Sequence, residues 1–119
     1  MWAHNAMAAD EGLTGRSLTL GCSIALTGPL GQAGTEQVAG MKAAFAEVNA
    51  AGGVYGREIR MEVKDDGYVA SRTLKNVTEM VDAQSVFALI SPLGTANTAS
   101  ILPLIESKGI PTVGPVTGA

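Results

Sequence analysis

The sequence predicts an α/β fold: a doubly wound parallel sheet with the flavodoxin-like strand order 2-1-3-4. Short apolar runs alternate with amphipathic segments, in the order βαβαβαβ. Because each connection between successive strands contains a helix, we expect parallel strands with helices on both faces of the sheet. Residues 86–90, Val-Phe-Ala-Leu-Ile, are continuously apolar, which is typical of a strand buried on both faces.

The first strand is predicted over residues 18–26, where large apolar and small residues alternate. The small residues on one face would let a helix pack closely. A loop with three glycines follows at residues 27–34, and Thr35 is then expected to cap a helix that stops at Gly52-Gly53. The apolar stripe of this helix is predicted at Val38, Met41, Phe45 and Val48.

Residues 58–64 alternate between charged and apolar side chains, which indicates a half-exposed edge strand. Asp65-Asp66-Gly67 is interpreted as a solvated turn. The alternative is metal binding or acid–base chemistry, but no further acidic residue or histidine accompanies the pair at metal-site spacing. A second helix then follows, with its stripe at Leu74, Val77 and Val81 and with Met80 beside it.

The loop at residues 91–98 follows the third strand and precedes a helix that stops at Lys108-Gly109. A helix start at the carboxyl end of a parallel strand favours a small anionic or zwitterionic ligand. The alternative is that Thr95 or Asn97 merely caps the helix. Pro103 is expected to kink or interrupt it, and residues 110–113 form a short fourth strand before a last loop at 114–118.

Composition excludes several functions. The net charge of −3 and the absence of a basic cluster argue against nucleic-acid binding and a membrane-surface role. No P-loop or dinucleotide motif follows the first strand, and the single histidine lies in the leader, so no catalytic triad can be assembled. We therefore predict no enzyme, cofactor or metal site. The one cysteine, Cys22, is expected to be a small buried apolar residue.

Four segments carry a resemblance to a known family: residues 24–31, residues 49–57, Asp65-Asp66, and residues 94–111 from Gly-Thr to Gly-Ile-Pro. In this order and spacing they resemble the branched-chain amino-acid-type periplasmic binding proteins. The similarity covers nearly all of residues 18–119. These relatives are two-lobed solute receptors of ABC importers that close on a ligand like a hinge, and their fold agrees with the α/β unit predicted above.

The resemblance implies a ligand site in the loops. Thr95 is similar to the family's hydroxyl residue that binds the ligand carboxylate, together with the backbone N–H of Ala96. Thr117 and the carbonyl group of Val116 match the loop that holds the ligand's ammonium group.

The resemblance also places Leu30, Gln32 and Ala33 of the first loop over the ligand. Some family members carry a tyrosine where this chain has Ala33, so the smaller side chain leaves room for a larger ligand.

The resemblance further implies that residues 17–119 form a truncated N-terminal lobe without the second lobe. Residues 1–16 are interpreted as a leader, since Ala6-Met7-Ala8 is similar to a secretory cleavage region. The parent protein is expected to be periplasmic and to bind an amino acid or related carboxylate for import through ABC-importer membrane subunits. The isolated chain would bind weakly or not at all. The alternative is a small self-associating α/β domain, a homodimer without its own ligand.

Overall fold

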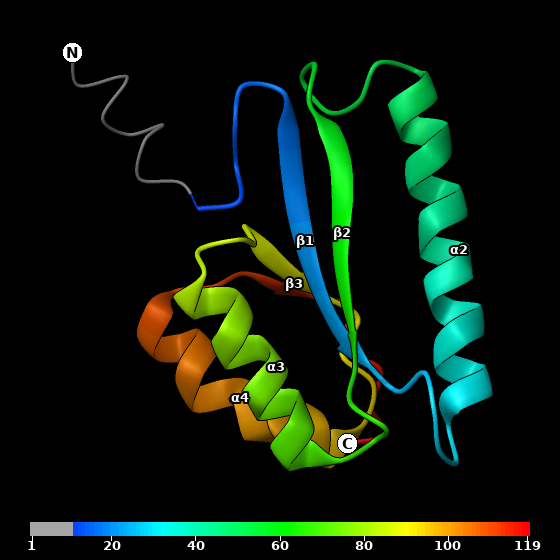
Figure 1. Cartoon of the computed structure of the whole chain (residues 1–119), viewed down its shortest axis with the longest axis vertical. Helices are drawn as coiled ribbons and strands as arrows, with labels where there is room; N and C mark the ends of the chain where they lie inside the picture. The colour runs from blue at the N-terminus through cyan, green and yellow to red at the C-terminus, as the bar shows by residue number, and fades with distance from the viewer. Residues whose placement is uncertain (1–10) are drawn as a thin grey trace.

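A computed structural model describes residues 11–119 and shows one sheet of four parallel strands (Figure 1). The strand order is β2-β1-β3-β4, which confirms the predicted topology. Strand β1 pairs with β2 over its whole length, from Ser17 opposite Glu58 to Ile24 opposite Asp65. The strands are β1 (Ser17–Ile24), β2 (Glu58–Asp65), β3 (Ala88–Ile90) and β4 (Thr112–Val113).

Three helices connect these strands: α2 (Gly31–Ala50), α3 (Ala70–Asp82) and α4 (Thr95–Lys108). Helices α3 and α4 pack side by side on one face of the sheet, and α2 lies alone on the other (Figure 1). The sheet is therefore covered on both faces, as the alternation of strands and helices predicts. None of the described helices is long and apolar enough to cross a bilayer.

The larger core lies under α3 and α4. Met80 is fully buried, and its sulfur lies only 2.8 Å from the position a Cβ atom would take at Gly21 of β1. This confirms that the small face of the first strand admits a closely packed helix. The stripe of α3 differs from the prediction, because Met80 is in the core while Leu74 is 40% exposed. The buried cluster comprises Val77, Met80, Val81, Val86, Leu89 and Ile101.

The core under α2 is smaller, and the predicted stripe of that helix is confirmed only in part, because Met41 and Phe45 are half-buried and Val48 is exposed. Only Gly31, Gly34 and Val38 of α2 are buried, and Val48 is 37% exposed. Cys22 and Ile24 of β1 complete this cluster, with Met41 among the half-buried residues packed against it. The buried positions of α2 all lie in its first two turns, and its later apolar residues are half-buried or exposed.

Two helix details differ from the sequence prediction. Helix α2 begins at Gly31 rather than after Thr35, whose hydroxyl donates to the Gly31 carbonyl from inside the helix. Helix α4 continues through Pro103 without interruption. It ends as predicted at Gly109, whose φ of 65° is the left-handed conformation that glycine adopts readily.

Candidate functional site

Four loops follow the carboxyl ends of the strands and meet at one edge of the sheet (Figure 1). They lie between β1 and α2, between β2 and α3, between β3 and α4, and after β4. In an open parallel sheet this edge is where ligands bind. The start of α4 and the loop after β4 carry four of the seven residues for which the sequence predicts ligand contact: Thr95, Ala96, Val116 and Thr117.

Thr95 and Ala96 are the first two residues of α4, and Gly94 is its N-cap. Gly94 has a φ of 110° and no side chain, so it caps none of the first backbone N–H groups. The helix begins its hydrogen bonding when the Thr98 N–H donates to the Gly94 carbonyl. Neither Thr95 nor Asn97 caps the helix, so the capping interpretation is wrong. The uncapped N–H groups at this end are donors for an anion.

The last loop is held against the loop before α4. The Gly94 N–H donates to the Val116 carbonyl, and the Val116 N–H donates to the Pro92 carbonyl, both at 2.9 Å. This pairing places Thr117 beside Thr95, and the two side-chain hydroxyls are hydrogen-bonded to each other. Both threonines are exposed, so the structure brings one hydroxyl group from α4 and one from the last loop to the surface at the start of α4.

The three residues that the sequence places in the first loop lie at the same edge but are not joined to this pair, and two of them, Gln32 and Ala33, belong to the first turn of α2 instead. Leu30 is the N-cap of α2, and Gln32 donates to Glu36 one turn further along the helix, at 3.0 Å. Ala33 is exposed. Helix α2 is connected to the loop before α4 by Gln37, whose side-chain amide donates a hydrogen bond to the Ser91 carbonyl.

Asp65 ends β2 and holds the loop before α2. Its carboxylate accepts hydrogen bonds from the Leu26 N–H at 2.8 Å, the Thr27 hydroxyl at 2.7 Å and the Gly67 N–H at 2.9 Å. These donors, the Leu26 N–H first, lower the pKa of Asp65 from 3.8 to about 2. The carboxylate is therefore charged at neutral pH and is committed to the loop rather than to acid–base chemistry.

Asp66 corrects the prediction of a solvated turn, because its exposure is 0%. One carboxylate oxygen accepts from the hydroxyls of Ser23 and Thr73, both at 2.9 Å, and the other accepts from the Tyr68 N–H. The amide of Asn97 donates in turn to the Thr73 hydroxyl at 2.8 Å. This network runs from β1 through the β2–α3 turn to the first turn of α4.

Asp66, Tyr68 and Asn97 were missed as residues that shape the site. An aspartate pair directly after a strand was a usable signal, since such a position lies at the carboxyl edge of the sheet. The sequence could not show that one aspartate points outward to the loop while its neighbour points inward to three donors.

Chemically, the edge offers hydrogen-bond donors and no catalytic set. Cys22 is 1% exposed, and burial, then the charge of Asp66, raises the pKa of its thiol to about 12. The cysteine is therefore the buried apolar residue that its sequence context predicts. Within residues 11–119, no three side chains of His, Cys, Asp or Glu come together to hold a metal ion.

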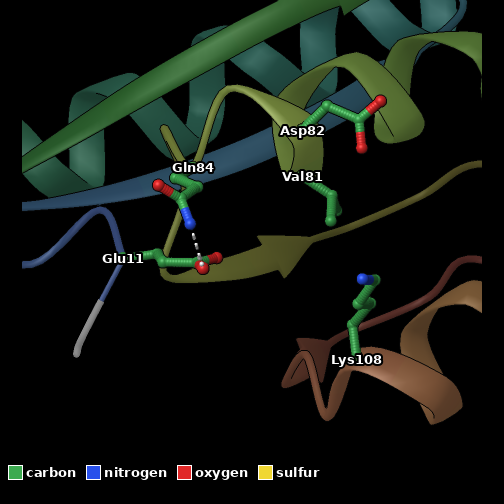
Figure 2. Close-up of a pocket in the computed structure, with 5 residues that line it drawn as sticks. All are labelled: Glu11, Val81, Asp82, Gln84 and Lys108. Atoms are coloured by element: carbon green, nitrogen blue, oxygen red, sulfur yellow. Dashed lines mark hydrogen bonds between the residues drawn. The ribbon is translucent and has the colours of Figure 1, made fainter.

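A separate pocket of about 240 Å³ lies at the opposite edge of the sheet. Figure 2 shows Gln84 donating to Glu11 across it, with Asp82 and Lys108 at the ends of α3 and α4. None of the predicted site residues lines this pocket. Its polar side chains carry charges of both signs and define no single ligand chemistry.

Comparison with known proteins places the chain among solute receptors. A family model described as periplasmic binding protein matches residues 17–119. Comparison with curated proteins gives no match.

Three solved structures are similar. A possible leucine/isoleucine/valine-binding protein from Rhodopirellula baltica is 31% identical with a TM-score of 0.82, over 87% of this chain and 28% of that one. A fatty acid ABC transporter substrate-binding protein from Thermomonospora curvata is 29% identical with a TM-score of 0.81, over 91% and 26%. A branched-chain amino acid transporter substrate-binding protein from Streptococcus pneumoniae, in complex with isoleucine, is 26% identical with a TM-score of 0.81, over 87% and 30%. The chain thus spans less than a third of each solved structure.

Proposed function

The chain belongs to the periplasmic binding protein family, and on this premise we propose that it supplies one wall of a solute site in a longer ABC-transporter receptor. Members of this family bind solutes and are not enzymes, which agrees with the absence of a catalytic motif from the sequence. The proposed ligand is an amino acid or a related carboxylate. The proposed location of the longer protein is the periplasm.

The observation that carries this proposal is the pair of hydroxyls at the uncapped start of α4. Thr95 and Thr117 are hydrogen-bonded to each other and exposed, and Gly94 leaves the first N–H groups of the helix without a side-chain cap. A carboxylate needs several donors directed at one point, and a helix N-terminus adds favourable electrostatics. In the proposed complex, Thr95 and the Ala96 N–H donate to the ligand carboxylate.

The ligands of the similar proteins favour recognition through the carboxylate. One relative is described with isoleucine and another is described as a fatty acid receptor. Amino acids and fatty acids share a carboxylate but not an ammonium group. We therefore place the carboxylate at Thr95, the part of the site that would serve both classes of ligand.

The ammonium subsite is the less constrained part of the proposal. The Val116 carbonyl oxygen already accepts the Gly94 N–H with one lone pair. A ligand ammonium group would donate to the second lone pair of that oxygen and to the Thr117 hydroxyl. Leu30, Gln32 and Ala33 stand at the same edge, where they would cover the ligand from the α2 side.

Thr95→Ala in the longer protein tests the assignment. Losing one hydrogen bond to a charged carboxylate should weaken ligand binding by about 1.5–3 kcal/mol in calorimetry with L-isoleucine, L-leucine, L-phenylalanine and decanoate. Thr98→Ala is the matched control on the same helix, because the Thr98 hydroxyl is buried without a hydrogen-bond partner and its loss should leave affinity unchanged. Equal affinity of Thr95→Ala and wild type would reject this site.

Residues 1–119 alone are expected to bind none of these ligands tightly, because the second lobe of such receptors would supply the remaining contacts and closure. Saturable binding at low micromolar concentration by residues 1–119 would contradict this expectation.

Self-association is the second candidate, and the exposed strand β4 favours it. Within residues 11–119 this strand pairs only with β3; Val113 of the strand and Val116 after it are 61% and 44% exposed. An uncovered strand edge with apolar side chains promotes pairing between copies, although the prolines at 111 and 115 weaken it. Light scattering at micromolar concentration gives a dimer mass if this candidate is correct and a monomer mass if it is not.

A further inference from the structure

Tyr68 adopts an unusual backbone conformation at the carboxyl edge of the sheet. Its φ of 65° lies in the left-handed region, which a bulky side chain rarely enters. Asp66 supports this conformation, since its buried carboxylate accepts the Tyr68 N–H at 3.0 Å and its carbonyl accepts the Val69 N–H at 2.9 Å. The turn after β2 is therefore held by hydrogen bonds to a buried carboxyl group, and it directs one aromatic side chain toward the neighbouring loop.

The ring of Tyr68 lies against Gly94, the residue directly before Thr95. A Cβ atom at Gly94 would come within 2.7 Å of the ring carbon Cε1 of Tyr68 and within 2.5 Å of the Asn97 amide oxygen. Glycine at this position thus allows the ring to reach the start of α4. The side chain of Tyr68 nevertheless stays 41% exposed, so part of the ring surface is open at the edge.

No other aromatic residue in the described part of the chain lies at this edge. Tyr55 is 93% exposed in the turn before β2, and Phe87 directly precedes β3, both at the opposite edge. Phe45 lies in the later turns of α2 and lines a groove with Ile59 at the start of β2. Because the first turn of α2 carries the small Ala33 at this edge, Tyr68 is the aromatic surface available to a ligand held at Thr95.

We propose that Tyr68 is a further, specificity-determining residue of the solute site, whose ring forms the wall against which the non-polar part of a carboxylate ligand packs. This inference rests on the proposed function of the same site. Aromatic rings contribute a large apolar contact area, and a ring that already lies against Gly94 loses little conformational freedom on binding. The ligand class that fits is a carboxylate with an aliphatic or aromatic side group.

Tyr68→Gly separates a ligand contact from a structural role. Glycine adopts a positive φ without strain, and the ring is partly exposed, so thermal stability should stay equal or rise. Affinity of the longer protein for L-isoleucine, L-phenylalanine or decanoate, whichever the wild type binds, should fall about tenfold through the loss of the aromatic contact. Tyr68→Phe keeps the ring and should keep affinity within about twofold of wild type.

Tyr55→Gly is the matched control. Tyr55 also has a positive φ, 51°, but lies at the opposite edge of the sheet. Its replacement should change thermal stability in the same direction as Tyr68→Gly and leave the affinity for all three probes unchanged.

The outcomes separate the two proposals. If the wild type binds one of the probes and Tyr68→Gly binds it equally well, the assignment of Tyr68 is wrong while the proposed function stands. If Tyr68→Gly lowers the melting temperature and affinity falls with it, the ring is a structural support and the assignment is overturned. If the wild type binds none of the probes, the proposed function and this inference both fail.

Discussion

The two faces of the sheet are covered in different ways. Under α3 and α4, a cluster of apolar side chains is buried almost completely, with Val77, Met80 and Ile101 at 1%, 0% and 0% exposure. Under α2, most apolar residues around the small buried cluster are only half-buried. One face is therefore stabilised chiefly by side-chain packing. The α2 face depends on the close approach of the helix backbone to β1 and the residue after it, and on hydrogen bonds between α2 side chains and the sheet backbone.

The helices show the origin of this difference. In α3 the buried residues Thr73, Val77, Met80 and Val81 recur along one stripe through the whole helix. In α2 the buried positions end at Val38, in the second turn. Further along, α2 is tied by Asn49, whose amide donates to the Ile59 carbonyl at 2.9 Å and accepts the Ile59 N–H at 2.8 Å. The tie satisfies backbone groups of the edge strand β2 that have no neighbouring strand.

The largest difference between the faces is expected for methionine truncation. Met80→Ala removes a fully buried side chain from the α3–α4 face and should lower the free energy of unfolding by about 2–5 kcal/mol. Met41→Ala removes a half-buried side chain from the α2 face and should cost about 1 kcal/mol. Urea unfolding of the two variants measures both values, and equal losses would show that the faces are packed alike.

Alanine substitutions at two glycines of α2, Gly34 and Gly40, test how closely that helix approaches the sheet. A Cβ atom at Gly34 would lie 1.7 Å from the Ala25 carbonyl oxygen, so Gly34→Ala must push α2 off the sheet and should cost about 1–3 kcal/mol. In the described part of the chain, no atom beyond the adjoining backbone of its own helix and its two chain neighbours lies within 4 Å of the Cβ position of Gly40. Gly40→Ala should therefore stabilise the protein by about 0.5–1 kcal/mol through helix propensity. The same sign for both variants would contradict the role given to Gly34.

The smallest effect concerns pH and the α2 face. The folded state lowers the pKa of Asp65 to about 2, so the charged carboxylate stabilises the loop before α2 at any pH above its ordinary value of 3.8. This contribution should disappear as pH falls from about 4 to 2. Melting temperatures of wild type and Asp65→Asn should differ at pH 7 and converge near pH 2. A constant difference across that range would exclude Asp65 as the group that titrates.

The aspartate pair shows how far sequence reasoning reached at the site. The pattern of β2 predicted where the strand ends, and the resemblance pointed to the two threonine loops that the structure places together. The separate functions of Asp65 and Asp66 were not predictable from composition or spacing. They depend on which donors face each carboxylate, and those donors come from β1, α3 and the loop before α2. The position of Tyr68 was missed for the same reason, because its partner Gly94 is distant in sequence.

By itself, the sequence determined the fold class, the strand order and the location of the loops at one sheet edge. Strand and helix periodicity are local properties, and parallel pairing follows once each connection contains a helix. The tertiary structure decided which periodic residues are buried, as Val48 and Leu74 are not and Met80 is. It also decided which polar groups meet, including Thr95 with Thr117 and Asp66 with Thr73. Burial and hydrogen bonding between distant segments depend on where helices approach the sheet, and that placement is set by packing across the whole domain rather than by any local pattern.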